Sequence, residues 1–261
     1  MFKLIFSFFC LILIIEPSLA QKLVIHPKKG EIHFTSKTII KDQQAFDNAI
    51  NQKREKLVEA LLSTFNGVYD SAIVDSNFLK RVKSEMKDQP FKVEDFDYHQ
   101  VYLDTIIKSY ITNADTLVGD YTVISIKKST FVIHAEKDVL KTVTSSEDFA
   151  FSKNNEVMIQ EFRKERKVIN GYNCFKVIYK YKIDFSDVEE VDGVDILGIL
   201  GVDQINTTEF WVTEKIQSLF HPICKEKEIL EKYYPLEILQ ETSFFKGMKM
   251  FYTLKSISLS N

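Results

Sequence analysis

The chain has 261 residues, of which 34 are lysine or arginine and 37 are aspartate or glutamate, so its formal net charge is −3. This near balance gives no electrostatic reason to expect a nucleic acid or a strongly anionic surface as a partner. The length is sufficient for one sizeable domain or two small ones, and we expect a single α+β domain over residues 21–261.

The first twenty residues have the pattern of a secretory signal peptide. Lys3 precedes an apolar run from Leu4 to Ile15, and Ser18–Ala20 forms a small-x-small cleavage signal. The alternative, an uncleaved anchor, is disfavoured because the run is short for a bilayer and Glu16-Pro17 interrupts it. We therefore expect an exported protein that begins at Gln21 and resides in the periplasm or outside the cell, with or without attachment to the outer membrane.

No segment after the signal peptide is long and apolar enough to cross a membrane as a helix. The predicted mature chain opens with a β-prone stretch from Lys22 to Ile40, in which Pro27 and Gly30 bracket a turn. His26 and His33 flank this turn, but no third ligand lies nearby in the sequence. We expect a strand or hairpin here and no metal site.

Residues 42–113 have helical periodicity. A first amphipathic helix is predicted over Asp42–Asn66, with Asp42 as N-cap and Gly67 as the stop signal. A shorter helix is predicted over Asn77–Lys87, and a third over Tyr98–Asn113, where apolar pairs recur every four residues. Such stripes usually pack on the protein's own core, although a membrane surface or a partner is the alternative.

The β signal returns from Tyr121 onward and is clearest between Val168 and Ile183. After a turn at Gly171, apolar side chains occupy every second position from Phe175 to Ile183, and lysines occupy three of the four positions between them. This period of two residues predicts a half-buried strand. Further strands are predicted at Asn206–Thr213 and Gly247–Leu259, which gives an antiparallel core, and a change of phase between Leu254 and Ile257 predicts a bulge.

An acidic and then apolar loop separates the first two of these strands. Six carboxylates lie between Asp184 and Asp195, and the aliphatic run of Val194–Val202 follows. The spacing lacks the alternation of a calcium-binding loop, so a solvated loop is favoured over a calcium site. We take the loop at about 184–205 as the leading functional segment, because its apolar part suits a flap over a cavity or a contact with a partner.

Two cysteines remain after signal cleavage, Cys174 and Cys224. In an oxidising compartment they can pair, and the bridge would close a loop of about fifty residues worth roughly 3–4 kcal/mol. Alternatively, Cys174 is a small buried hydrophobe and Cys224 a free thiol. Both interpretations remain open at this point.

No phosphate-binding loop, nucleophile elbow, HExxH or CxxC motif is present. The five histidines are scattered singly, and no spacing indicates a catalytic triad. We therefore predict a non-catalytic protein without a cofactor or metal. The alternatives are a secreted hydrolase whose site is assembled from distant residues, and a purely structural or interaction module.

Four short motifs in the C-terminal half resemble a known family. They are I-x-G-Y-x-C-x-K at Ile169–Lys176, E-F-W-V-T at Glu209–Thr213, Y-P-L-E-I at Tyr234–Ile238 and K-G-M-K-M-F-Y-T-L at Lys246–Leu254. This order resembles the secreted GLPGLI proteins of Bacteroidota and is similar to the wider LolA/LolB-like periplasmic group.

The resemblance implies a strongly curved antiparallel sheet, a half-barrel, with the helices of residues 42–113 packed on its concave side. In LolA-like proteins the concave face holds acyl chains, so the resemblance implies a lipid or another apolar ligand, or an envelope protein as partner. The implied cavity lining is Phe175, Val177, Tyr179, Tyr181, Trp211, Met248, Met250 and Tyr252. The alternative is that these side chains form an ordinary core.

Overall fold

A computed structural model describes residues 24–68, 84, 94–125, 127, 129–136, 139–148, 150–152, 154–183, 205–241 and 247–261. The predicted signal peptide, the helix predicted over Asn77–Lys87 and the acidic loop up to residue 204 lie outside this range, apart from Ser84. Among the described helices, none has the length and apolar character needed to cross a membrane.

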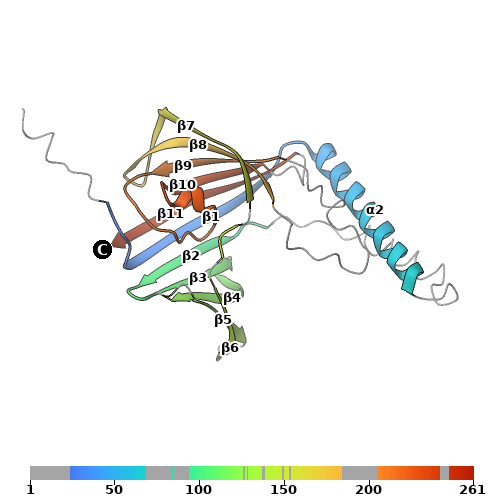
Figure 1. Cartoon of the computed structure of the whole chain (residues 1–261), viewed down its shortest axis with the longest axis horizontal. Helices are drawn as coiled ribbons and strands as arrows, with labels where there is room; N and C mark the ends of the chain where they lie inside the picture. The colour runs from blue at the N-terminus through green and yellow to red at the C-terminus, as the bar shows by residue number, and fades with distance from the viewer. Residues whose placement is uncertain are drawn as a thin grey trace, which may run out of the picture.

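One sheet of eleven strands dominates the described structure (Figure 1). Its strands lie in the order β6-β5-β4-β3-β2-β1-β11-β10-β9-β8-β7, and all neighbouring strands are antiparallel. The strands are β1 (Lys29–Ile40), β2 (Asp97–Leu103), β3 (Ile106–Asn113), β4 (Thr116–Ser125), β5 (Ser129–Glu136), β6 (Val139–Asp148), β7 (Asn154–Ile169), β8 (Tyr172–Ile183), β9 (Asn206–Thr213), β10 (Tyr234–Glu241) and β11 (Met248–Ser260). The predicted antiparallel core is therefore confirmed.

The chain reaches the two halves of the sheet in succession. From β1 it runs outward through neighbouring strands to β6 at one edge, crosses to β7 at the other edge, and returns to β11 beside β1. The first and last strands thus meet in the middle of the sheet, as the adjacent blue and red arrows of Figure 1 show. This pairing brings the residues just before β1 close to the C-terminus.

The turn predicted before β8 and the bulge predicted in β11 are both confirmed. Asn170 and Gly171 form the turn between β7 and β8 with φ values of 46° and 84°, as a two-residue hairpin with an Asn-Gly pair requires. The predicted bulge is also present: Phe34 pairs with Leu254 but His33 pairs with Ser256, so Lys255 is the extra residue of β11.

The helix predicted over Tyr98–Asn113 is wrong, because this segment forms the hairpin of β2 and β3. Its apolar residues come in adjacent pairs, and a strand directs the two members of each pair to opposite faces. The turn at Asp104, where φ is 54°, sets the pair on β2 four residues before the first pair on β3, and a second pair follows four residues later on β3, so the spacing imitates a helical repeat. This segment therefore belongs to the sheet and cannot be one of the helices that were expected to cover its concave face.

Helix α2 (Gln43–Val68) confirms the first predicted helix, and the Asp42 side chain caps it by accepting a hydrogen bond from the Ala45 N–H at 2.9 Å. In its first two turns, Phe46 and Ile50 pack on Met248 of β11. The rest of α2 projects away from the end of the sheet (Figure 1). Because only two residues separate β1 from α2, the helix starts at the sheet's end and does not cover the concave face as predicted.

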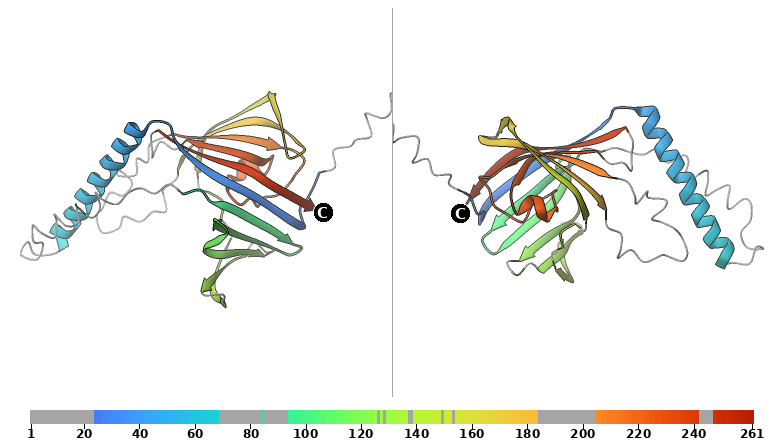
Figure 2. Two further views of the ribbon diagram at one scale, coloured as in Figure 1. Left: turned by 180° about the vertical axis from the view of Figure 1, so that it is seen from behind. Right: turned by 45° about the horizontal axis from the view of Figure 1, so that its top comes forward.

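A different segment covers that face. Residues 214–233, between β9 and β10, include the short helix α5 (Lys227–Leu230), and we call them the plug segment. Ile216, Ile229 and Leu230 are buried in one cluster with apolar residues of β1 and β8–β11. Figure 2 shows α5 lying within the curve of the sheet. The plug segment therefore packs on the central strands and on β8–β10, and together they enclose the main hydrophobic core.

Replacing Gly30 with alanine tests the close approach of β1 and β11. Gly30 has φ +113°, and a Cβ there would collide with the Ser258 carbonyl oxygen, whereas Gly171, with φ +84°, has open space around it. Gly171→Ala should cost about 1–2 kcal/mol for its backbone conformation. Gly30→Ala should lower the free energy of unfolding by at least about 2 kcal/mol more, measured by urea denaturation. Equal losses in both variants would contradict this close packing.

Candidate functional site

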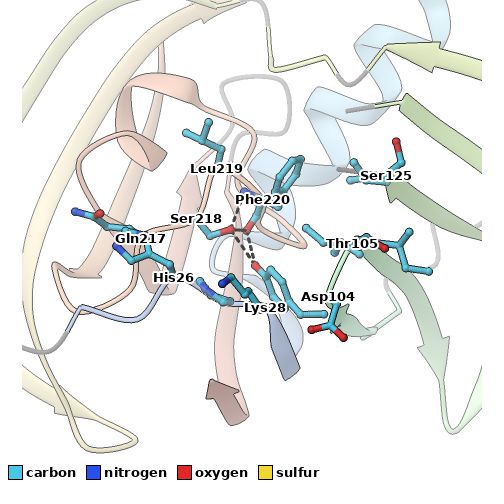
Figure 3. Close-up of a pocket in the computed structure, with 14 residues that line it drawn as sticks. His26, Lys28, Asp104, Thr105, Ser125, Gln217, Ser218, Leu219 and Phe220 are labelled. Carbon is cyan, nitrogen blue, oxygen red and sulfur yellow. Dashed lines mark hydrogen bonds between the residues drawn. The ribbon is translucent and has the colours of Figure 1, made fainter. Parts of the chain in front are cut away.

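A cavity of about 320 Å³ lies between the plug segment and the half of the sheet that contains β2–β4. Figure 3 places residues 217–220 across the pocket from Thr105 and Ser125. Four stretches of chain contribute its walls: the residues before β1, the β2–β3 turn, the end of β4 and the plug segment. The lining residues are His26, Pro27, Lys28, Tyr102, Asp104, Thr105, Ile106, Ile107, Ile124, Ser125, Gln217, Ser218, Leu219 and Phe220.

Backbone hydrogen bonds fix the stretches that form the mouth. Ile25 forms a parallel bridge with Ile216: its N–H donates to the Lys215 carbonyl at 2.8 Å, and its own carbonyl accepts from the Gln217 N–H at 2.9 Å. The Asp104 N–H donates to the Lys28 carbonyl at 2.7 Å. The segment before β1 therefore ties the plug segment to the β2–β3 turn.

Tyr102 joins the two sides of the pocket from the inside. Its hydroxyl donates to the Phe220 carbonyl at 3.1 Å, lies 3.0 Å from the Ser218 hydroxyl, and accepts from the Gln100 side chain at 3.0 Å (dashed lines in Figure 3 mark the bonds among the residues drawn). Burial raises the pKa of Tyr102 to about 12, so the hydroxyl stays protonated and keeps its donor. This network holds the 218–220 turn at a fixed distance from β2.

His221 holds the next part of the plug segment. Its Nε2 donates to the Pro235 carbonyl at 3.0 Å, and its Nδ1 accepts from the N–H groups of Ile223 and Cys224 at 3.0 and 2.9 Å. Accepting at Nδ1 requires the neutral ring. Burial lowers the pKa of His221 to about 3, which keeps that form at physiological pH.

Most of the pocket lining is apolar, and charged side chains stand at its mouth. Ile107 pairs with Tyr102 on one side and with Ile124 on the other, so these three side chains share one face of the sheet. Leu219 and Phe220 approach from the plug segment. The charged groups His26, Lys28 and Asp104 are exposed at the mouth. The arrangement suits an apolar group inside and a polar group at the entrance.

The residues predicted to line a cavity lie elsewhere. Phe175, Val177, Tyr179 and Tyr252 are buried beneath the plug segment. Met248 and Met250 pack near the start of α2, and Tyr181 is half-buried at the margin of the main cluster. None of the predicted residues lines this pocket, and the first four form ordinary core.

The prediction that Trp211 shares this cavity face is wrong. Its strand neighbours Phe210 and Val212 are buried on the plug side, so Trp211 points to the opposite face. There its Nε1 donates to Glu209 at 3.1 Å, and the Lys167 ammonium lies 4.1 Å from the ring centroid. The indole therefore belongs to a charged outer surface and has no part in the pocket.

The disulfide interpretation is also wrong, since Cys174 and Cys224 are both free and buried. Phe175 contacts Tyr233 of the plug segment, with ring centroids 5.3 Å apart, so strand alternation directs Cys174 to the other face of β8. Cys224 belongs to the plug segment itself. The sheet separates the two thiols, and burial raises the pKa of each.

The two histidines considered as metal ligands, His26 and His33, have different surroundings. His26 lies at the pocket mouth, while the His33 ring stacks on His99 with centroids 4.2 Å apart, and His99 stacks on Tyr110 at 4.5 Å. These ring faces are turned to each other, so they offer no flat platform to a ligand. Within the described ranges, no group of three or more His, Cys, Asp or Glu side chains is placed to hold a metal ion.

None of the pocket residues was predicted from the sequence to line an apolar cavity. Its walls come from segments separated by up to about two hundred positions, and no short motif links them. The one available signal was the mixed apolar and charged stretch after Trp211, which contributes Leu219 and Phe220. An apolar stretch in a long connection between strands can indicate a segment that folds back over the sheet.

No protein-family model matches this sequence, and no curated protein is detectably similar to it. Among solved structures, the crystal structure of LprF from Mycobacterium bovis aligns with 9% identity and a TM-score of 0.31 over 89% of each chain. The LolA superfamily protein NE2245 from Nitrosomonas europaea aligns with 9% identity and a TM-score of 0.30, over 94% of this chain and 93% of its own. The GLPGLI resemblance stays a prediction.

The buried neutral His221 predicts a loss of stability in mild acid. The unfolded chain takes up a proton near pH 6.5, whereas the folded ring resists until about pH 3, so the free energy of unfolding falls as pH drops below 6.5. Between pH 6.5 and pH 5 the loss from this residue is about 2 kcal/mol. Urea denaturation at a series of pH values measures it.

The matched variant is His221→Gln, which is less stable at neutral pH but has no ring to titrate. Its loss between pH 6.5 and pH 5 should be smaller than that of the parent by about the same 2 kcal/mol. His99, whose pKa burial also lowers, contributes equally in both proteins and cancels in the difference. Parallel pH dependences for parent and variant would show that His221 is not buried as a neutral ring.

Proposed function

We propose that this chain is an exported, non-catalytic protein of the cell envelope that binds the apolar part of a ligand in the pocket between β2–β4 and the plug segment. The observation that carries the proposal is the pocket itself: a partly open pocket of about 320 Å³, lined mainly by apolar surface, with exposed charged groups at its mouth. Ligand pockets usually have volumes of about 300–1,000 Å³, so this one suits a single acyl chain or another small apolar group.

The placement of the ionisable groups supports binding over catalysis. Asp104 has 60% of its side chain exposed and lies near the exposed Lys29, with 3.6 Å between Oδ2 and Nζ. His26 and Lys28 are likewise exposed at the mouth. Groups in contact with water lack the desolvation that tunes acids and bases for catalysis. The buried titratable groups nearby, Tyr102 and His221, are engaged in holding the plug segment.

The location rests on the predicted signal peptide at residues 1–20. An exported protein with an apolar pocket suits the transport or retention of a poorly soluble compound outside the cytoplasm. The tests below use the predicted mature form, Gln21–Asn261, because the signal peptide itself would bind apolar probes.

Filling the pocket tests the proposal directly. Ile107→Trp places a larger side chain against Tyr102 and Ile124, and it should weaken binding of the neutral fluorophore N-phenyl-1-naphthylamine by about tenfold or more. Fluorescence titration measures the dissociation constant. Circular dichroism and urea denaturation establish that the variant is folded.

The control is Ile111→Trp. Ile111 lies on the same strand and face as Ile107 and is also half-buried, but it does not line the pocket. Its variant should bind within about twofold of the parent. A parent protein that does not bind the fluorophore, or equal weakening in the two variants, would contradict the proposal.

A further inference from the structure

One basic side chain at the pocket mouth, Lys28, has no ion-pair partner among the described residues. Lys28 is exposed and lines the pocket. The acidic residue of the rim, Asp104, has Oδ2 3.6 Å from Nζ of Lys29. Over the ranges that the structure describes, no carboxylate oxygen lies within 4.0 Å of the Lys28 ammonium. Among the described residues, the Lys28 ammonium therefore has no direct ion-pair partner.

The backbone around this charge is held firmly. The Lys28 N–H donates to the Ser260 carbonyl at 2.9 Å, and the Lys28 carbonyl accepts from the Asp104 N–H at 2.7 Å. Two residues earlier, the His26 N–H donates to the Asn261 side chain at 2.6 Å. Lys28 and His26 are thus anchored on the same side of the mouth, with their side chains directed at the cavity (Figure 3).

We propose that the ligand of this pocket is a single-chain amphiphile with an anionic head group. Lys28 binds the head group, the His26 ring supplies a second hydrogen-bond donor, and the chain enters the cavity toward Ile107. This inference rests on the proposed binding function and specifies its ligand class. The apolar interior supplies most of the affinity, while the exposed cation selects among head groups of different charge.

The cavity volume supports one chain. At about 320 Å³ the pocket lies near the lower end of the usual range, and Ile107, Ile124 and Leu219 are among its apolar walls. A head group at Lys28 stays in contact with water, so the charge is not buried and has no large desolvation cost. An apolar chain in the cavity and an anionic head group at Lys28 therefore match the two parts of the site.

The experiment compares four ligands that share a dodecyl chain: dodecanoate, dodecyl phosphate, dodecanol and dodecyltrimethylammonium. Each displaces the neutral fluorophore from the Gln21–Asn261 protein at neutral pH, low salt and concentrations below micelle formation. Dodecanoate or dodecyl phosphate should bind about fivefold tighter than dodecanol, and the ammonium compound should bind most weakly. Tighter binding of one anion over the other identifies a carboxylate or a phosphate as the preferred head.

Variants of Lys28 assign the preference to this residue. Lys28→Gln should abolish the advantage of the anions and leave dodecanol unchanged, while Lys28→Glu should favour the ammonium ligand. Lys37→Gln is the control, because Lys37 is also an exposed lysine of the same N-terminal region, on β1 but away from the pocket. The preference in the parent should shrink as salt is added.

Two outcomes distinguish a failure of the head-group inference from a failure of the proposed function. If all four ligands bind equally and Ile107→Trp weakens all of them, the pocket binds apolar chains but the anionic head group is wrong. If none of the ligands binds the parent, both the head-group inference and the proposed function fail. A preference for anions that persists in Lys28→Gln would also overturn the role of Lys28.

Discussion

The structure depends on covering one apolar face of a sheet that does not close on itself. Eleven antiparallel strands place Phe34, Val177, Phe210 and Ile238 on the same side, and water must be excluded from that side for the sheet to be stable. The plug segment provides the cover over the central strands and β8–β10. The plug segment covers β2–β4 only in part, and the pocket is the space between it and these strands.

The same contacts that stabilise the cover also shape the pocket. Tyr102 bonds the turn that carries Ser218 and Phe220, the bridge of Ile25 to Ile216 fixes the mouth, and His221 orders the chain beyond it. A change that loosens the plug segment therefore alters stability and the pocket together. Binding measurements on variants of these residues need a stability measurement beside them, whereas Ile107 and Lys28 change the pocket without removing any of these bonds.

The strands were the predictable part of this fold. The alternation in β8, the Asn-Gly turn and the bulge at Lys255 are local patterns, and each appears where the sequence placed it. The hairpin of β2 and β3 was mistaken for a helix because its apolar pairs, one on β2 and two on β3, recur every four residues across the turn at Asp104. The site was not predictable. Its walls meet only because β11 returns to β1 and the plug segment folds over the sheet, and no local pattern encodes those long-range contacts.

The most direct measurement is a crystal structure of the protein with a dodecanoate that carries bromine at the end of its chain. The proposed binding mode predicts an anomalous bromine signal inside the cavity, in contact with Ile107, Ile124 or Leu219, and a carboxylate near Lys28. The Ile107→Trp protein should lose this signal. A bromine located on another surface, or a cavity filled by a rearranged plug segment with no ligand, would contradict the assignment of this pocket as the binding site.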